Sequence, residues 1–189
     1  MAVTDGQLMI ENAKIVFRNF TGKEGMYNAE GDRNFCVLLE EDMARHLIQE
    51  GWNVKTLRAR EEGDEPQPYI QVSVKYRGRN GNKVRPPAIV MITSKGRTSL
   101  QEEECELLDW VDIANVDLII RSFQWAVSGK TGIKAYLKSI YITIEEDYLQ
   151  LKYADVPELG GGALAIETGQ DDNVIEGEFF EMESMKELA

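Results

Sequence analysis

The residues best suited to binding chemistry in this sequence are cations and aromatic rings gathered in two windows that contain no acid. Residues 66–101 carry seven Lys and Arg and residues 118–144 carry four, although the chain has 33 Asp and Glu against 21 Lys and Arg. Aromatic side chains are interleaved with these cations in both windows. This combination suits a strand of unpaired nucleotides, because phosphates attract positive charge and bases stack on flat rings. The alternative is an ordinary solvated strand face.

Strand alternation predicts which of these side chains share a face. Arg121, Phe123 and Trp125 alternate along one expected strand, so they point the same way. For the two rings the alternative is burial in the core, which we expect instead for Trp52 and Trp110. The candidate nucleic-acid contacts, taken from both windows and from the first strand, are Lys14, Arg18, Phe20, Tyr69, Lys75, Arg77, Arg79, Lys83, Arg85, Lys95, Arg97, Arg121, Phe123, Trp125, Lys130, Lys134, Tyr136 and Lys138.

Catalytic patterns are weak by comparison. His46 is the only histidine, so no Ser/His/Asp or Cys/His arrangement is indicated. Residues 129–131 (Gly-Lys-Thr) resemble the end of a phosphate-binding loop, but Gln124 replaces its first glycine and the segment joins two strands. Asp109, Asp112 and Asp117 are a conceivable nuclease metal cluster, but caps and loops are the simpler roles. We therefore predict no catalysis, no bound metal and no cofactor.

Length and composition predict one folded domain with a tail. The chain has 189 residues, enough for a sizeable core. Residues 1–6 lack the apolar stretch of a signal peptide, and no apolar run approaches the roughly 20 residues that a membrane helix needs. Cys36 and Cys105 have neither metal-ligand spacing nor a disulfide pattern. A reducing, cytoplasmic setting is the default expectation.

The net charge of −12 is unevenly distributed. Residues 154–189 hold ten acids and one Lys, so they supply −9 of it. Acidity is therefore no argument against a nucleic-acid partner. We expect a domain at 1–156 and a flexible, disordered acidic tail at 157–189, in which Phe179 and Phe180 form an apolar pair that is a candidate partner-binding site.

The hydrophobic pattern predicts a mainly β protein. Expected strands are 8–20, 33–39, 52–58, 69–77, 87–93, 115–127 and 131–144, with a helix at 41–50. Turns at 78–82 and 128–130 predict that strands 69–77 and 87–93, and strands 115–127 and 131–144, form hairpins. Another helix start is expected at Ser99. The apolar residues occupy odd-numbered positions before Ser139 and even-numbered positions after it, which predicts a bulge there. Together these features indicate a small, partly open β-barrel of the OB type with one or two short helices.

Several segments resemble single-stranded DNA-binding proteins encoded by tailed bacteriophages, especially those of actinobacterial hosts. They are residues 15–20 (IVFRNF), 27–28 (YN), 31–35 (GDRNF), 51–54 (GWNV), 68–72 (PYIQV), 108–110 (LDW) and 132–138 (GIKAYLK). Their order and spacing extend the resemblance over residues 8–156. It implies an OB-type fold, and protection of single-stranded DNA during phage replication or recombination in the host cytoplasm. It supplies no residue-level map of the DNA path.

The tail is similar to those of bacterial single-strand binders in being acidic with a hydrophobic element, and implies possible replication or recombination partners. It differs because nine residues follow Phe180. Other functions remain open at this point: an RNA-binding or strand-annealing module of the same fold, a metal-dependent nuclease, and an adaptor that binds only protein.

Overall fold

The computed structural model describes residues 2–4, 6–58, 65–78, 84–153 and 155–156. Its strands are β1 (Ala2–Thr4), β2 (Gln7–Ile10), β3 (Ile15–Asn19), β4 (Arg33–Leu38), β5 (Val54–Leu57), β6 (Gln67–Val74), β7 (Ala88–Thr93), β8 (Gly96–Leu100), β9 (Ile113–Val127) and β10 (Lys130–Ile144). Its helices are α1 (Glu41–Gln49), the 3-10 helix η2 (Glu104–Asp109) and α2 (Tyr148–Lys152). Among the described residues, no helix is long and apolar enough to cross a membrane.

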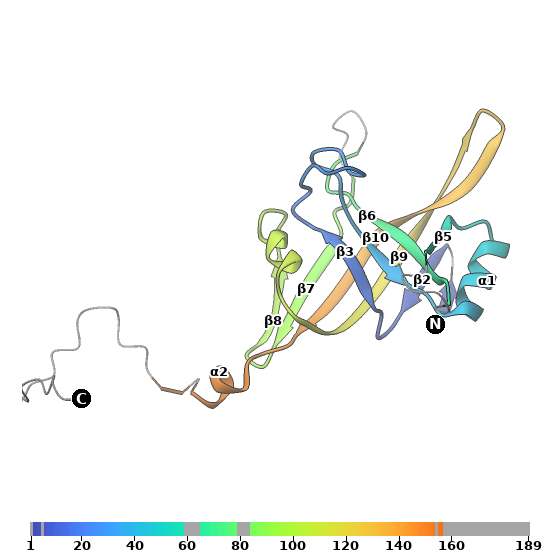
Figure 1. Cartoon of the computed structure of the whole chain (residues 1–189). Helices are drawn as coiled ribbons and strands as arrows, with labels where there is room; N and C mark the ends of the chain where they lie inside the picture. Colours follow the sequence, from blue (N-terminus) through green and yellow to red (C-terminus); the bar gives the residue numbers. More distant parts are fainter. Residues whose placement is uncertain (1, 5, 59–64, 79–83, 154, 157–189) are drawn as a thin grey trace, which may run out of the picture. The chain divides into compact units, whose positions relative to one another are not determined.

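The longest strands, β9 and β10, form the hairpin that the sequence predicts (Figure 1). Ser128 and Gly129 join them with φ of 50° and 78°, the positive values that a tight two-residue hairpin turn requires. A register shift between Leu137 and Ser139 confirms the predicted bulge. Because of this extra residue, Ala135 and Leu137 before it and Ile140 after it all point into the core.

The strand pairing at the other edge of β10 shows that the predicted hairpin between residues 69–77 and 87–93 is wrong. Strands β6 and β7 do not form a hairpin with each other; both pair with β10 in parallel, β6 at Ala135 and Tyr136 and β7 from Ser139 onward. The two strands therefore follow one another along β10. Turn-like composition at 78–82 predicts a change of direction, but it does not identify the strand that becomes the neighbour.

The first predicted strand is also corrected, because residues 8–20 form two strands. Asn12 has a φ of 51° and interrupts the extended chain, so β2 pairs with β9 whereas β3 pairs with β4. Strand β4 and helix α1 confirm the predictions for 33–39 and 41–50. Strand β8 lies where a helix start was expected at Ser99, and the helical segment begins at Glu104.

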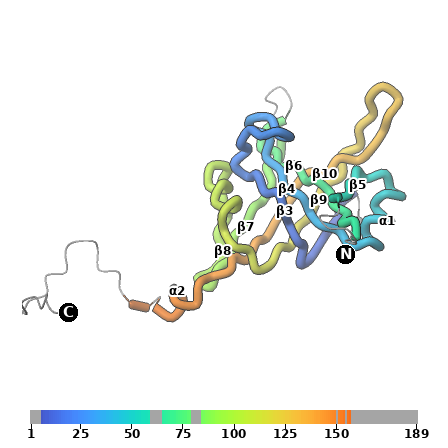
Figure 2. Tube along the Cα trace, viewed as in Figure 1, coloured from blue at the N-terminus to red at the C-terminus, as the bar shows by residue number. Residues whose placement is uncertain are grey.

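The strands form one sheet in the order β1-β2-β9-β10-β6-β4-β3, with β5 on β6 and the β7–β8 hairpin on β10. The sheet curls without closing, and this confirms the predicted mainly β, partly open barrel of the OB type (Figures 1 and 2). Apolar faces of β2, β4, β6, β9 and β10 supply most of the core, with Leu47 of α1 and Leu108 of η2. The opposite face of β6, β9 and β10 is left to polar, cationic and aromatic side chains.

The chain divides into two units, Met1–Ala154 and Asp155–Ala189. All the strands and helices described above belong to the first unit. The predicted acidic tail at 157–189, including Phe179 and Phe180, lies outside the described residues.

Candidate nucleic-acid interface

Two adjoining cavities lie against the non-core face of β6, β9 and β10. The first, here the amide cavity, has a volume of about 430 Å³ and is lined by Tyr27, Asn28, Asp32, Arg33, Asn34, Asn53, Ile70, Gln71, Ser73, Lys75, Trp125, Ile133, Lys134 and Ala135. The second, here the basic cavity, has a volume of about 990 Å³ and is lined by Asp32, Lys75, Arg77, Gly78, Val84, Arg85, Arg121, Ser122, Phe123, Lys134 and Tyr136. Asp32, Lys75 and Lys134 line both cavities, so the two form one continuous groove.

The wall of the basic cavity is built by the register of the β9–β10 hairpin. Arg121 lies opposite Tyr136, and Phe123 lies opposite Lys134. The rings of Phe123 and Tyr136 meet edge to face, with centroids 5.8 Å apart, and Lys134 Nζ lies 5.5 Å from the centre of the Tyr136 ring. Phe123 remains 55% exposed, so a flat face is available to a ligand. Arg121 and Phe123 therefore share a face of β9, as strand alternation predicts, and Lys134 and Tyr136 of β10 lie beside them.

Trp125 extends this wall into the amide cavity. It pairs with Gly132 across the hairpin, and a Cβ built on Gly132 would lie 2.9 Å from Cζ2 of the indole ring. The ring can therefore lie against β10 at Gly132, because glycine has no side chain to block it. The sequence-based alternative of core burial is wrong for Trp125, which is only half-buried and lines the groove.

Positive charge reaches the groove from three separate segments. Lys75 and Arg77 come from the end of β6 and the residues after it, Arg85 precedes β7, and Arg121 and Lys134 belong to the hairpin. Nη2 of Arg121 donates to the main-chain oxygen of Arg85 at 3.4 Å, which connects two of these segments. Lys75 forms an ion pair with Asp32, so the tertiary structure brings one acid into a surface built from acid-free windows.

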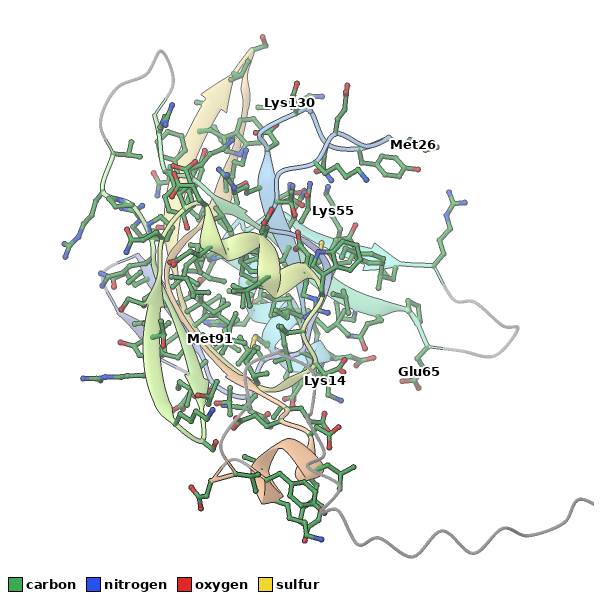
Figure 3. The ribbon with its side chains drawn as sticks, turned by 90° about the vertical axis from the view of Figure 1, so that its left-hand side faces the viewer. Lys14, Met26, Lys55, Glu65, Met91 and Lys130 are labelled. Atoms are coloured by element: carbon green, nitrogen blue, oxygen red, sulfur yellow. The ribbon has the colours of Figure 1, made fainter. Side chains whose placement is uncertain are left out.

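Several predicted contacts lie outside the groove. Lys14 and Lys130 are far apart on the molecule, as Figure 3 shows. Arg18 donates from Nη1 to the main-chain oxygen of Val111 at 2.8 Å, and Lys138, at the bulge, donates to Oε1 of Gln7 at 2.5 Å. The remaining predicted contacts that line neither cavity are Tyr69 on β6, Lys95 in the β7–β8 turn and Arg97 on β8. Arg79 and Lys83 lie outside the described residues.

Phe20 is a correction. Its side chain is 0% exposed and stacks on Phe35, with ring centroids 5.3 Å apart and planes at 19°. It is therefore a core residue and presents no ring to a ligand. The register of β3 against β4 shifts between Val16 and Asn19, so simple alternation along this strand does not give the side on which Phe20 lies.

Trp110 is a second correction, because it was expected in the core and is 84% exposed. In a 3-10 helix residues three apart share a face, and Cys105, Leu108 and Val111 occupy the inward one. Trp110, at the end of η2, falls on another face. Trp52 is 6% exposed, and this confirms its predicted core position.

The carboxylates considered as a metal cluster cap separate loops. Asp109 accepts hydrogen bonds from the main-chain N–H groups of Phe20 and Thr21, at 2.7 and 2.8 Å. Asp117 accepts one from the main-chain N–H of Asn12 at 2.8 Å. Within the described ranges, no group of three potential metal ligands comes together.

Sequence reasoning missed the polar lining of the amide cavity. Tyr27 is 89% exposed on the loop between β3 and β4, a loop whose far end is marked by Met26 in Figure 3. Four amide side chains and a serine line the same cavity, namely Asn28, Asn34, Asn53, Gln71 and Ser73. No spacing rule connects these residues, since they come from two loops and two strands.

An OB-type barrel with a groove of cations and rings defines a class of proteins that bind unpaired nucleic acid. The family model described as "Putative phage ssDNA-binding domain" matches residues 2–188, and the chain belongs to this family. The family assignment agrees with the resemblance seen in the sequence.

The chain is also similar to solved structures of bacteriophage proteins. The single-stranded DNA-binding protein from bacteriophage Enc34 in complex with ssDNA is similar with a TM-score of 0.50 and 12% identity, over 75% of this chain and 88% of that chain. A second structure of the same phage protein gives a TM-score of 0.48 at 13% identity, over 75% of this chain and 83% of that chain. The single-stranded DNA-binding protein gp2.5 of bacteriophage T7 gives 0.37 at 9% identity, over 83% and 97%. No curated protein matches the sequence.

Proposed function

We propose that this chain binds single-stranded DNA along the groove and acts by binding alone, without catalysis. The observation that carries the proposal is that the five cationic side chains lining the basic cavity lie on one surface with the rings of Phe123, Trp125 and Tyr136. Membership in a phage ssDNA-binding family supports it. The setting that follows is phage DNA replication or recombination in the cytoplasm of the host bacterium, where the bound strand is protected.

The chemistry of the groove favours unpaired over paired DNA. Bases in a duplex are already stacked on their neighbours, whereas an unpaired base gains roughly 1–3 kcal/mol by stacking on an aromatic side chain. Phosphates on the same strand would lie against Arg77, Arg85 and Arg121. These contacts release counterions and make the affinity depend on salt.

The function is tested by titrating a fluorescently labelled oligonucleotide and its blunt duplex with the protein, following anisotropy at several salt concentrations. We expect tighter binding to the single strand. If three to five groove cations contact phosphates, log Kd should change with log salt with a slope of magnitude about 2 to 3.5. Equal affinity for the duplex, or an affinity that does not change with salt, would contradict the proposal.

The site is tested with charge-matched variants. Arg121→Glu and Lys134→Glu reverse a charge inside the groove, and Lys95→Glu and Arg97→Glu make the same change on the β7–β8 hairpin. Each groove variant should weaken binding and reduce the salt slope by about 0.7, because one phosphate contact to the single strand is lost. The hairpin variants should retain the wild-type slope. The opposite pattern would move the site to β7 and β8.

The acidic residues 157–189 have a separate proposed role. A tethered polyanion is present at high local concentration, so even a weak attraction lets it compete with DNA for the groove. Phe179 and Phe180 are the proposed anchor for a replication or recombination partner, because apolar rings in an acidic segment are otherwise unfavourably exposed to water.

A further inference from the structure

The amide cavity differs chemically from the rest of the groove. The basic cavity offers cations, which recognise phosphates irrespective of sequence. The amide cavity is also lined by charged residues (Asp32, Arg33, Lys75 and Lys134), but it adds the side chains of Asn28, Asn34, Asn53 and Gln71, which carry donors and acceptors without charge. Uncharged groups of this kind complement the edges of bases better than phosphates.

A chain of hydrogen bonds holds these amides in defined orientations. Asn34 is 7% exposed, and its Nδ2 donates to the main-chain oxygen of Asp32 at 3.1 Å and to Oδ1 of Asn28 at 2.7 Å. A main-chain oxygen can only accept, so it determines which end of the Asn34 amide is the nitrogen. Oδ1 of Asn34 then accepts from Nε2 of Gln71 at 3.1 Å. The orientation of Gln71 is thereby set as well.

This arrangement leaves specific groups free for a ligand. Within the part of the chain that the structure describes, Oε1 of Gln71 and Nδ2 of Asn28 have no protein partner. Gln71 also retains its second N–H. A free carbonyl oxygen beside a free N–H on one amide is the pair that binds the adjacent donor and acceptor of adenine, N6 and N7. Adenine presents the same donor–acceptor pair on its other edge, at N6 and N1.

Stacking surfaces line the same cavity. Tyr27 lies on the loop between β3 and β4, and Trp125 lies against Gly132 of β10; both rings line the cavity. A base entering the amide cavity would therefore find a ring to stack on as well as a polar edge to pair with. Its volume of about 430 Å³ is within the range of about 300–1,000 Å³ that is usual for small-ligand sites.

We infer that the amide cavity is a base-reading subsite in which Gln71 and Asn28 recognise one unpaired adenine of the bound strand. The inference rests on the proposed function, because it requires single-stranded DNA in the groove. It adds a base preference to a surface whose cations and rings alone would accept any sequence. Lys75 and Lys134, which line both cavities, would hold the phosphates on either side of this base.

The experiment compares short thymine-rich oligonucleotides that are identical except for a few positions. These positions carry adenine, thymine, or purine deoxyriboside, which is adenine without its 6-amino group. We expect wild-type protein to bind the adenine strand about 5- to 150-fold more tightly than the purine deoxyriboside strand, because only adenine donates to Oε1 of Gln71. Ring size and stacking are nearly the same in the two purines, so they do not produce this difference.

Gln71→Leu removes the reading group and keeps a similar side-chain volume. It should bind the two purine strands with equal affinity. If Gln71→Leu loses its fold because Oδ1 of Asn34 is left unpaired, Asn28→Ala tests the same subsite from the loop and should reduce the adenine preference. Lys95→Glu is the control that should leave the preference unchanged.

The outcomes separate the two claims. If wild-type protein binds all strands with equal affinity, single-stranded DNA binding stands and the base-reading subsite is refuted. A preference for adenine that persists in Gln71→Leu and Asn28→Ala also refutes it. If wild-type protein binds none of the strands, the proposed function itself fails.

Discussion

Replacement of Trp125 by alanine tests the groove most directly, since the structure defines how much of this ring a ligand can use. The indole lies against Gly132 of β10 and is half-buried, so part of the ring remains exposed to a ligand. A base stacked on an aromatic side chain contributes roughly 1–3 kcal/mol. Trp125→Ala should therefore weaken single-strand binding by about 5- to 150-fold.

The fold should tolerate this change, because Trp125 is outside the buried core cluster of the described residues. Anisotropy titrations measure the loss of affinity, and thermal unfolding by circular dichroism verifies that the midpoint is unchanged. Trp110→Ala is the matched control: this indole is 84% exposed and lines neither cavity. Its removal should leave binding within about twofold of wild type.

Gly132→Val provides independent evidence without removing the ring. A Cβ at Gly132 meets the indole at 2.9 Å, and the backbone there has no positive φ, so the substitution displaces Trp125 without straining the strand. It should weaken binding in the same direction as Trp125→Ala, and the double variant should lose little more. If Trp125→Ala binds with wild-type affinity while remaining folded, the stacking role is refuted. If it unfolds with unchanged affinity per folded molecule, the ring is structural.

Three further outcomes are expected. Phe20→Ala should lower the free energy of unfolding by about 3–5 kcal/mol in chemical denaturation, and leave the affinity of the folded fraction unchanged, because the ring lies in the core. Burial raises the pKa of Tyr76 and of Cys105 above their ordinary values of 10.0 and 9.0. The unfolded state therefore loses these protons first, and the free energy of unfolding should fall as pH rises above about 9. Tyr76→Phe should flatten this dependence, and an unchanged pH profile in that variant would contradict the assignment. Deleting the residues after Pro157 should tighten DNA binding at low salt, with the advantage shrinking as salt rises; identical affinities at both salts would refute competition by the tail.

Much of the architecture can be predicted from the sequence, because side chains in a strand alternate with a period of two. This periodicity places Arg121 and Phe123 on one face of β9 and predicts the bulge in β10 from a parity change after Ser139. The hairpin turn is local, so Ser128 and Gly129 identify it without tertiary information. The cations and most of the rings of the groove could be predicted from the sequence because they follow the same strand periodicity.

Parity alone fails where the backbone departs from regular geometry. The bulge in β3 turns Phe20 inward, and the three-residue period of η2 turns Trp110 outward. Neither irregularity has a strong local signal. In both cases the prediction was wrong about whether the ring points into the core or toward solvent.

Only the tertiary structure decides which faces meet, because strand pairing brings together residues that are far apart in the chain. Parallel pairing of β6 and β7 with β10 places Lys75 and Arg85 beside Lys134. The loop between β3 and β4 then brings Asp32 to Lys75 and Asn28 to the amide cavity. Such contacts depend on the path of the whole chain, and no local pattern of residue types specifies it.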